Sequence, residues 1–305
     1  PGDVEDIPTG EWEQDPDCTS AIISPDPLHR GIILIENGEA VVRKIDVVFP
    51  VVMGKHGADG TIQGLLDLSG IPYVGCGVLA AASCMDKSHI HMVMDDYDIA
   101  TAEWRIITQR EISEIDERCH EIAGELGFPL IVKPAKSGTS AGTGKADDLA
   151  QLIAAVKVAF SNDNKVVVEK YVSGRKMEAA VFGYDTPFST YIGEILDPDR
   201  VYDPTEVNQS TGDGLKIPAD ISDELQASIR ETAVKAYKAM GCKGLARLDF
   251  FLTDDGRLLL NKIGTSPGLR KNSVFPKLME HMGISHEDFV DMLLEQAIDN
   301  AERTY

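Results

Sequence analysis

The stretch GLARLDFFLTDDGRLLLNKI, at residues 244–263, predicts two antiparallel strands joined by a tight turn. Gly244–Leu252 is rich in apolar and aromatic residues and Arg257–Ile263 in apolar residues, a composition typical of strands. Between them, Thr253–Gly256 places a glycine where a hairpin turn favours a positive φ. We therefore expect a β-hairpin in this part of the chain.

Other elements flank this hairpin on both sides. Ser222 is a good N-cap and Gly241 a good stop signal, so a long helix is expected over residues 222–240. A terminal helix is expected from His286 to about residue 303. Upstream, the hydrophobic pattern predicts helices over 77–95, 112–126 and 148–160, and strands over 130–134, 165–172, 179–182 and 191–196.

The N-terminal part predicts a different unit. Residues 1–28 are rich in Asp, Glu and Pro without periodicity and are expected to form loop. Residues 45–52 and 71–74 have the pattern of buried strands on either side of a helix at 61–69. A strand, a helix and a strand in this order form a βαβ unit, which implies a parallel sheet. The predicted fold class is therefore α/β followed by α+β.

Composition excludes several classes of protein. The 305 residues are 43% hydrophobic, and 29 Lys and Arg stand against 50 Asp and Glu, for a net charge of −21. A wholly disordered chain is excluded, and the acidity argues against nucleic acid as the main partner. No apolar run reaches the ~18 residues of a membrane span, and no leader-like segment is present. The five scattered cysteines favour reduced thiols in a cytoplasm.

One loop has the composition of a phosphate site. KSGTSAG, at residues 136–142, follows a predicted strand that carries Lys133. Glycines let the backbone approach an anion, and Ser and Thr hydroxyls donate to phosphate oxygens. The loop matches neither G-x-x-x-x-G-K-[ST] nor G-x-G-x-x-G. Taken alone, it fits a phosphate site or an ordinary loop about equally well.

Several more specific motifs follow one another along the chain. They are GKHGADG (54–60), TIQG (61–64), GIPYVG (70–75), MDK (85–87), IVKPAKSGTSAG (131–142), VEK (168–170), GEI (193–195), RLDF (247–250) and NKIGTSPG (261–268). Together they resemble the D-alanine–D-alanine ligases of the ATP-grasp superfamily, including the variants that use D-serine or D-lactate. The resemblance covers about residues 45–298.

The resemblance implies three domains and a reaction. The domains are residues 1–85 (α/β, truncated because the family's opening strand and glycine-rich loop are absent from the sequence), 86–172 and 173–305, the last two α+β and holding ATP between them. The implied reaction is ATP-dependent joining of D-alanine to D-alanine, or to another D-amino or D-hydroxy acid, for peptidoglycan precursors. The resemblance also implies Mg²⁺ as a cofactor and a cytoplasmic homodimer. Nucleic acid and membranes are not expected as partners.

The resemblance also assigns candidate nucleotide-binding residues. Two lysines match those that hold ATP phosphates, two hydroxyls match the phosphate-covering loop, three positions match the adenine-binding strand, and one glutamate is a candidate for the ribose. In that order they are Lys87 and Lys133, Thr139 and Ser140, Glu169, Lys170 and Val172, and Glu178.

The candidate catalytic and metal-binding residues lie mainly in the C-terminal part. Arg247 matches an arginine that stabilises the acyl-phosphate oxyanion. Ser273 matches a serine near the second substrate, and Ser140 is also assigned a catalytic role. Asp249 matches a magnesium ligand. We expect the three lysines Lys87, Lys133 and Lys170 to point into the largest polar cleft.

Several functional positions depart from the family pattern. The family motif is N-E-[IVA]-N-T-x-P-G, in which the Glu and the second Asn bind magnesium. This chain has Lys262 and Gly264 at those two positions. An ammonium and a bare backbone provide no oxygen ligand from a side chain, so Mg²⁺ binding is expected to be weakened. The other departures are Lys176 for the ribose glutamate, Val207 and Asn208 for the Lys-Tyr of a mobile loop, Ala58 in the E-D-G loop and Met53 for a histidine.

Three interpretations of the sequence stay open. The first is a D-alanine–D-X ligase with impaired activity. The second is a catalytically inactive, ligase-like protein that at most binds nucleotide. The third, less favoured by the motifs, is an ATP-grasp enzyme for another carboxylate and amine.

Overall fold

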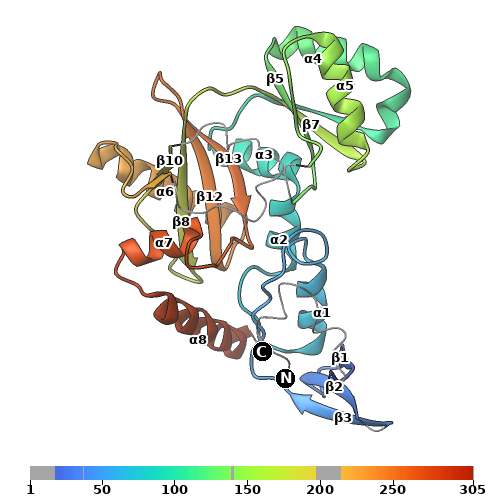
Figure 1. The fold of residues 1–305 in the computed structure, drawn as a ribbon, viewed down its shortest axis with the longest axis vertical. Coiled ribbons are helices and arrows are strands. Elements are labelled where there is room, and N and C mark those ends of the chain that lie inside the picture. Colours follow the sequence, from blue (N-terminus) through green and yellow to red (C-terminus); the bar gives the residue numbers. More distant parts are fainter. Residues whose placement is uncertain (1–17, 37, 139–140, 197–213, 305) are drawn as a thin grey trace.

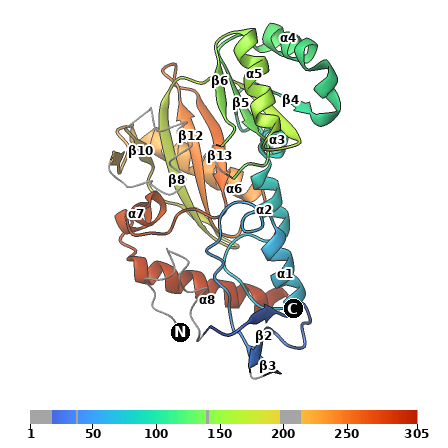
Figure 2. The same cartoon turned by 45° about the vertical axis from the view of Figure 1, so that its right-hand side comes forward.

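The computed structural model describes residues 18–36, 38–138, 141–196 and 214–304. Within these ranges the chain forms three antiparallel sheets (Figure 1). A four-stranded sheet with two helices lies at one end of the molecule and a three-stranded sheet at the other, with the largest sheet between them (Figure 2).

The element bounds are as follows. The helices are α1 (Thr61–Ser69), α2 (Val78–Met85), α3 (Lys87–Asp96), the 3₁₀ helix η3 (Gln109–Glu114), α4 (Ile115–Leu126), α5 (Leu149–Phe160), α6 (Asp223–Ala239), α7 (Val274–His281) and α8 (His286–Thr304). The strands are β1 (Ala21–Ile23), β2 (Gly31–Glu36), β3 (Glu39–Lys44), β4 (Trp104–Thr108), β5 (Leu130–Pro134), β6 (Gly144–Ala146), β7 (Lys165–Lys170), β8 (Arg175–Gly183), β9 (Phe188–Ser189), β10 (Gly193–Ile195), β11 (Leu215–Lys216), β12 (Gly244–Leu252) and β13 (Leu258–Gly264).

The predicted hairpin lies in the C-terminal sheet and is confirmed. Strands β12 and β13 pair antiparallel, and Gly256 in their turn has φ 84°. The strand order is β11-β10-β8-β12-β13, and β9 pairs with β8. The predicted cap of α6 is confirmed as well, because the Ser222 side chain accepts a hydrogen bond from the backbone N–H of Leu225.

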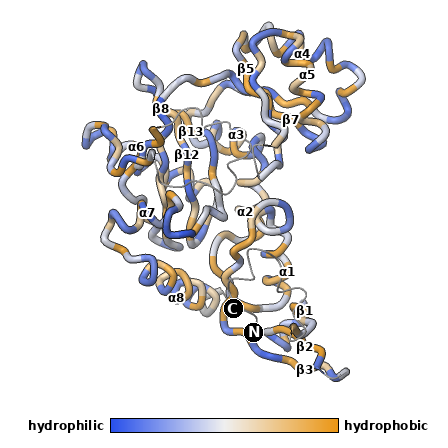
Figure 3. Tube along the Cα trace, in the orientation of Figure 1, coloured by the Kyte–Doolittle hydropathy of each residue, from blue (hydrophilic) through white to orange (hydrophobic). Residues whose placement is uncertain are grey.

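The two faces of this sheet carry different cores. Alternate residues of a strand point to opposite faces. Met177 and Ala179 of β8 join a core that includes α6, whereas Ala180 and Phe182 join a second core with α7 and α8. The hydropathy colours alternate along α8, as expected for a helix with one face against a core (Figure 3). Beyond Ala180, the second face continues into charged residues, and these form part of the candidate site.

The four-stranded sheet has the order β4-β7-β5-β6. We call it the central sheet because its strands come from the middle of the sequence, although it lies at one end of the molecule (Figure 1). Helices α4 and α5 cover one face, where Ile122, Leu152 and Val168 belong to a fully buried core. The predicted start of α5 is confirmed, because Asp148 accepts a hydrogen bond from the backbone N–H of Gln151. The opposite face presents Lys133 and Glu169 to the rest of the molecule.

Two N-terminal predictions were wrong. The expected strands at 45–52 and 71–74 reduce to one parallel bridge between Val48 and Tyr73, because within the described residues no further strand extends the ladder. Residues 21–23, expected as loop, instead form β1 of the three-stranded antiparallel sheet β1-β2-β3. There the backbone pairs with β2 despite the polar surroundings, so tertiary pairing overrides local composition.

The helix expected over 77–95 is two helices, α2 and α3. Asp86 separates them with an extended backbone, φ −90° and ψ 105°, and its side chain accepts hydrogen bonds from the backbone N–H groups of Ser88 and His89. An aspartate that caps a new helix in this way ends the preceding one. None of the helices in the described ranges is both long enough and apolar enough to cross a membrane.

Candidate functional site

Loops from three parts of the chain come together at one place. Gly138, in the loop after β5, lies so close to the N-terminal loop that a Cβ on it would be 3.0 Å from the Cα of Gly54. The Ser266 hydroxyl, from the loop after β13, donates to the backbone oxygen of Val52 at 3.0 Å. The N-terminal loop therefore lies beside both the loop expected to cover phosphates and the loop after β13. Thr139 and Ser140, in the loop expected to cover phosphates, fall outside the described residues.

The central sheet contributes a buried ion pair. The Lys133 ammonium on β5 donates to Oε2 of Glu169 on β7 at 2.6 Å. The other carboxylate oxygen accepts from Nε2 of His91, on α3, at 3.0 Å. His91 in turn stacks on Trp104, with ring centroids 4.9 Å apart. Burial acts to raise the pKa of Glu169, but the Lys133 charge and His91 outweigh it and lower the pKa to about 2.

Lys87 brings a second ammonium group to this place. Its Nζ donates to the backbone oxygens of Pro134 and Ser137 at 3.1 and 2.9 Å. Burial, followed by the positive charges of Lys133 and Lys262, lowers the pKa of Lys87 to about 7. Lys133 of β5 and Lys262 of β13 are therefore both close enough to repel the ammonium of Lys87.

The C-terminal sheet contributes a row of charged residues across three strands. Asp249 of β12 lies opposite Glu178 of β8 on one side and opposite Lys262 of β13 on the other. Arg247 binds both oxygens of Asp249, with Nε and Nη2 at 2.8 and 2.9 Å. Lys176 contacts Glu178 at 3.0 Å, and Arg247 approaches the other Glu178 oxygen to 3.3 Å.

These pairings shift the ionisation of the row. Burial acts to raise the pKa of Asp249, but the Arg247 and Lys176 charges outweigh it and lower the pKa. Partial desolvation and the nearby positive charge of Arg247 lower the pKa of Lys262, although its side chain is exposed to solvent. Both carboxylates of the row are thus neutralised by the chain's own cations.

This donor set does not fit the Mg²⁺ that the sequence resemblance implies. Magnesium favours oxygen ligands in near-octahedral geometry. Both oxygens of Asp249 already accept hydrogen bonds from Arg247. The second expected ligand position, opposite Asp249, has the ammonium of Lys262, and the third, Gly264, has no side chain. Across the described ranges, no three or more His, Cys, Asp or Glu side chains form a group that could hold a metal ion.

Some predicted residues lie away from the charged groups around Lys87, Lys133 and Asp249. Lys170 follows Glu169 on β7, and its ammonium donates to the backbone oxygen of Phe128 at 3.0 Å. Adjacent strand residues point to opposite faces, so the expectation that Lys170 shares the cleft with Lys87 and Lys133 was wrong. Val172 lies in the connection from β7 to β8, and Ser273 is the buried N-cap residue of α7.

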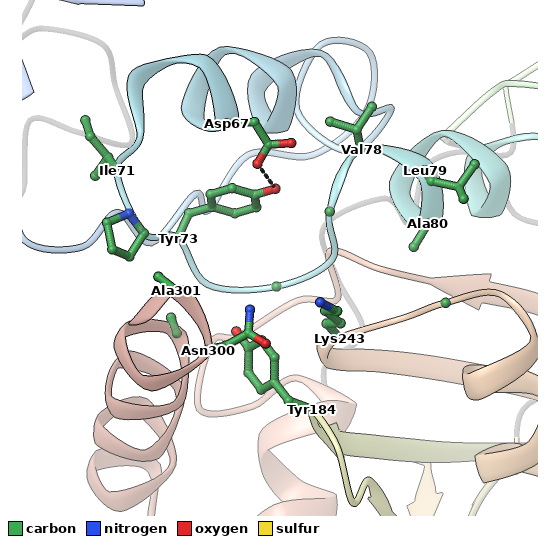
Figure 4. Close-up of a pocket in the computed structure, with 15 residues that line it drawn as sticks. Asp67, Ile71, Tyr73, Val78, Leu79, Ala80, Tyr184, Lys243, Asn300 and Ala301 are labelled. Carbon is green, nitrogen blue, oxygen red and sulfur yellow. Dashed lines mark hydrogen bonds between the residues drawn. The ribbon is translucent and has the colours of Figure 1, made fainter. Parts of the chain in front are cut away.

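A separate pocket of about 380 Å³ lies elsewhere. Figure 4 shows it between α1, α2 and α8, lined among others by Tyr73, Tyr184, Lys243 and Asn300. None of the lysines of the cluster lines it. The loop at residues 202–208, where the sequence departs from the family, lies outside the described residues.

Sequence reasoning missed two members of the site. His91 lies four residues after Lys87 and so on the same face of α3, a spacing that could have indicated it. Asn261 accepts from the Lys133 ammonium at 3.2 Å. It is the extra residue where the β12–β13 register shifts, a bulge that no sequence signal marked.

The comparisons with known proteins agree along nearly the whole chain. The family descriptions "D-ala D-ala ligase N-terminus" and "D-ala D-ala ligase C-terminus" match residues 9–76 and 93–295. The D-alanine–D-alanine ligase of Acetivibrio thermocellus is 39% identical over 310 residues, covering 97% of this chain and 82% of that protein. The vancomycin/teicoplanin A-type resistance protein VanA of Enterococcus faecium is 38% identical, covering 95% and 84%.

Solved structures show the same likeness. The VanG D-Ala:D-Ser ligase of Enterococcus faecalis superposes with a TM-score of 0.87 at 32% identity, covering 97% of this chain and 84% of that one. The D-alanine–D-alanine ligase of Coxiella burnetii gives a TM-score of 0.82 at 28% identity, covering 97% and 79%.

Proposed function

The chain belongs to the D-alanine–D-alanine ligase family and has its ATP-grasp fold, and from this premise we propose that it joins D-alanine to a second D-amino or D-hydroxy acid at a low rate. Members of this family are ATP-dependent ligases of peptidoglycan synthesis. The carboxylate of the first D-alanine attacks the γ-phosphorus of ATP, ADP leaves, and an acyl phosphate forms. The amine or hydroxyl of the second substrate then attacks the acyl carbon, loses its proton, and inorganic phosphate leaves.

The observation that carries this proposal is the pairing of Lys133 with Glu169 beside Lys87, at the site between the two larger sheets. Clustered ammonium groups favour a polyphosphate ligand, because an anion offsets their mutual repulsion. Arg247 is suited to stabilise negative charge on the reacting acyl phosphate. In this chain, however, its guanidinium is held by Asp249 and Glu178.

The low rate follows from the poor fit to Mg²⁺. When bound in such a site, magnesium neutralises phosphate charge during phosphoryl transfer. Instead, Lys262 places a positive charge opposite Asp249, and this charge repels Mg²⁺. Two unit charges about 4 Å apart interact by about 4 kcal/mol at an effective dielectric constant of about 20, and each 1.4 kcal/mol is about tenfold in affinity. Even a fraction of this repulsion weakens Mg²⁺ binding strongly.

The test is a ligation assay on the full chain. Purified protein is incubated with ATP, Mg²⁺ and D-alanine, alone or with D-serine or D-lactate, and both phosphate release and the joined product are measured. We expect product that depends on ATP and D-alanine, at a rate well below the ~10 s⁻¹ typical of enzymes. Robust Mg²⁺-dependent ligation at ordinary rates would contradict the impairment. Absence of any joined product would contradict the ligase activity.

A second candidate function is a ligase-like protein that binds nucleotide without turnover. The specific observation in its favour is the combination of Lys262 and Gly264 at two family ligand positions. The same assay separates the two functions when nucleotide binding is measured in parallel, since this candidate requires binding without product.

The cellular setting is part of the proposal. We place the protein in the cytoplasm, where ATP and the free D-amino acids are available, and as a homodimer like that implied by the family resemblance. Light scattering on the purified chain measures its molar mass directly. A mass of 33.1 kDa at micromolar concentration would contradict the dimer.

A further inference from the structure

Lys262 lies at the end of the charged row, on β13, the edge strand of the C-terminal sheet. It is directly opposite Asp249 on the neighbouring strand, and Asp249 is in turn opposite Glu178. Side chains that face each other across antiparallel strands have Cβ atoms about 4.5–5.5 Å apart. The ammonium of Lys262 therefore lies within reach of the position where a cation would contact Asp249.

The carboxylates of the row do not need this ammonium. Asp249 has a bidentate guanidinium partner in Arg247, and Glu178 has Lys176 at 3.0 Å. Among the described residues, the Lys262 ammonium has no hydrogen-bond or ion-pair partner, and its side chain is exposed. A purely structural ion pair with Asp249 would place Lys262 in the role that Arg247 already fills.

Lys262 also lies close enough to the central half of the site for its charge to act on Lys87. Burial and the positive charges of Lys133 and Lys262 lower the pKa of Lys87, whereas the carboxylates of Glu169 and Asp163 raise it. Glu169 is already paired with Lys133 at 2.6 Å. Ammonium groups from three separate elements thus converge with too few free carboxylates to balance them. Such an arrangement is costly unless an anion occupies the space between them.

We propose that Lys262 takes the place of a divalent cation, so that this site binds the polyphosphate of a nucleotide without metal. The inference rests on the proposed nucleotide site between the two sheets. An ammonium provides one positive charge and three N–H donors to phosphate oxygens. It cannot bridge two phosphate groups in octahedral geometry as magnesium does, so binding is retained while the chemistry is slowed.

The experiment measures binding by calorimetry on the full chain. The probes are adenylyl imidodiphosphate, an ATP analogue that resists hydrolysis, and inorganic tripolyphosphate, which has no base. Each is titrated once with excess EDTA and once with excess Mg²⁺. The test variant is Lys262→Gln, which removes the charge from an exposed side chain. The matched control is Lys235→Gln, an exposed lysine of α6 on the opposite side of the sheet.

We expect both probes to bind in EDTA, with dissociation constants within about threefold of those in Mg²⁺. Lys262→Gln should weaken binding in EDTA by about tenfold or more, the size of one lost charge-assisted contact, and Lys235→Gln should leave it unchanged. Circular dichroism and urea unfolding check that both variants fold.

The other outcomes distinguish the metal-free binding of phosphate from the presence of a nucleotide site. Binding only in Mg²⁺, or an unchanged affinity in Lys262→Gln, overturns the metal-free site and leaves the nucleotide site standing. Metal-free binding without any ligation product supports this inference and overturns the ligase activity. Failure of the folded protein to bind either probe in either buffer overturns both.

Discussion

The central sheet and the C-terminal sheet both present charged side chains to the same site, but they balance these charges differently. On the central sheet, Glu169 is matched by Lys133 and His91. On the C-terminal sheet, Asp249 and Glu178 are matched by Arg247 and Lys176, and Lys262 is then added in excess. The first half keeps the residue types that the family resemblance assigns to nucleotide binding. At two positions where the resemblance places metal ligands, the second half has Lys262 and Gly264. The comparison therefore predicts that nucleotide binding and metal use change separately.

The largest expected effect comes from the central half. Lys133→Ala leaves Glu169 as a buried charge without its ammonium partner, which should cost about 3–5 kcal/mol of stability and abolish nucleotide binding. The control is Lys170→Ala, on the opposite face of β7, where one hydrogen bond to a backbone oxygen is lost, for less than about 1.5 kcal/mol. Urea unfolding and calorimetry measure both. Equal losses of stability in the two variants would mean that the ion pair with Glu169 contributes no more than the hydrogen bond of Lys170.

The next effect is a pH dependence of stability from the same pair. The folded protein holds the pKa of Glu169 at about 2, below its ordinary 4.5, so its contribution is complete above about pH 4.5 and is lost as pH falls towards 2. The shift corresponds to about 3 kcal/mol. We expect the stability gap between the unmodified chain and Glu169→Gln to narrow by about this amount between pH 5 and pH 2. Urea unfolding at several pH values measures the gap, and a constant gap would contradict the shift.

The C-terminal half should respond to restored ligands. A side chain at 264 has room, since a Cβ at this position would have the Arg247 backbone oxygen as its nearest neighbour, at 3.8 Å. Lys262→Glu combined with Gly264→Asn should raise the ratio of ligation rates in Mg²⁺ and EDTA by about 100-fold, because a repulsive charge becomes attractive. Gly264→Asn alone is the control and should change this ratio little. If the double variant responds to Mg²⁺ no more than the unmodified chain does, positions 262 and 264 do not control the use of metal.

The smallest effect concerns Lys87, which lies between the halves. Its pKa of about 7 means that its amine is neutral above pH 7 in the free protein, whereas a bound polyphosphate favours the charged form. Binding above pH 7 must then take up a proton, so affinity should fall by up to about tenfold per pH unit. Calorimetry from pH 6 to pH 9 measures the slope. Lys87→Arg, which stays charged, should show a flatter profile; equal slopes would exclude Lys87 as the titrating group.

Local signals predicted the elements whose ends are set by neighbouring residues. Asp148 and Ser222 cap α5 and α6 through contacts only three residues away, and Gly256 allows the turn between β12 and β13. Predictions failed where distant partners decide. The strand expected at 45–52 needed a neighbouring ladder, and the central sheet showed that Lys170 points away from Glu169.

The amino-acid sequence by itself determined the family, the order of the motifs and the unusual residues Lys262 and Gly264, because those are properties of residue identity along the chain. Only the tertiary structure decided how the charges pair. Lys133 meets Asn261 across 128 positions of sequence, and Lys133 meets Glu169 across 36. Coulomb energies and hydrogen bonds depend on distances of a few ångströms and on burial, which folding sets and spacing along the chain does not. Lys262 is a surplus cation because Arg247 already donates to both oxygens of Asp249, and only the tertiary structure sets that pairing.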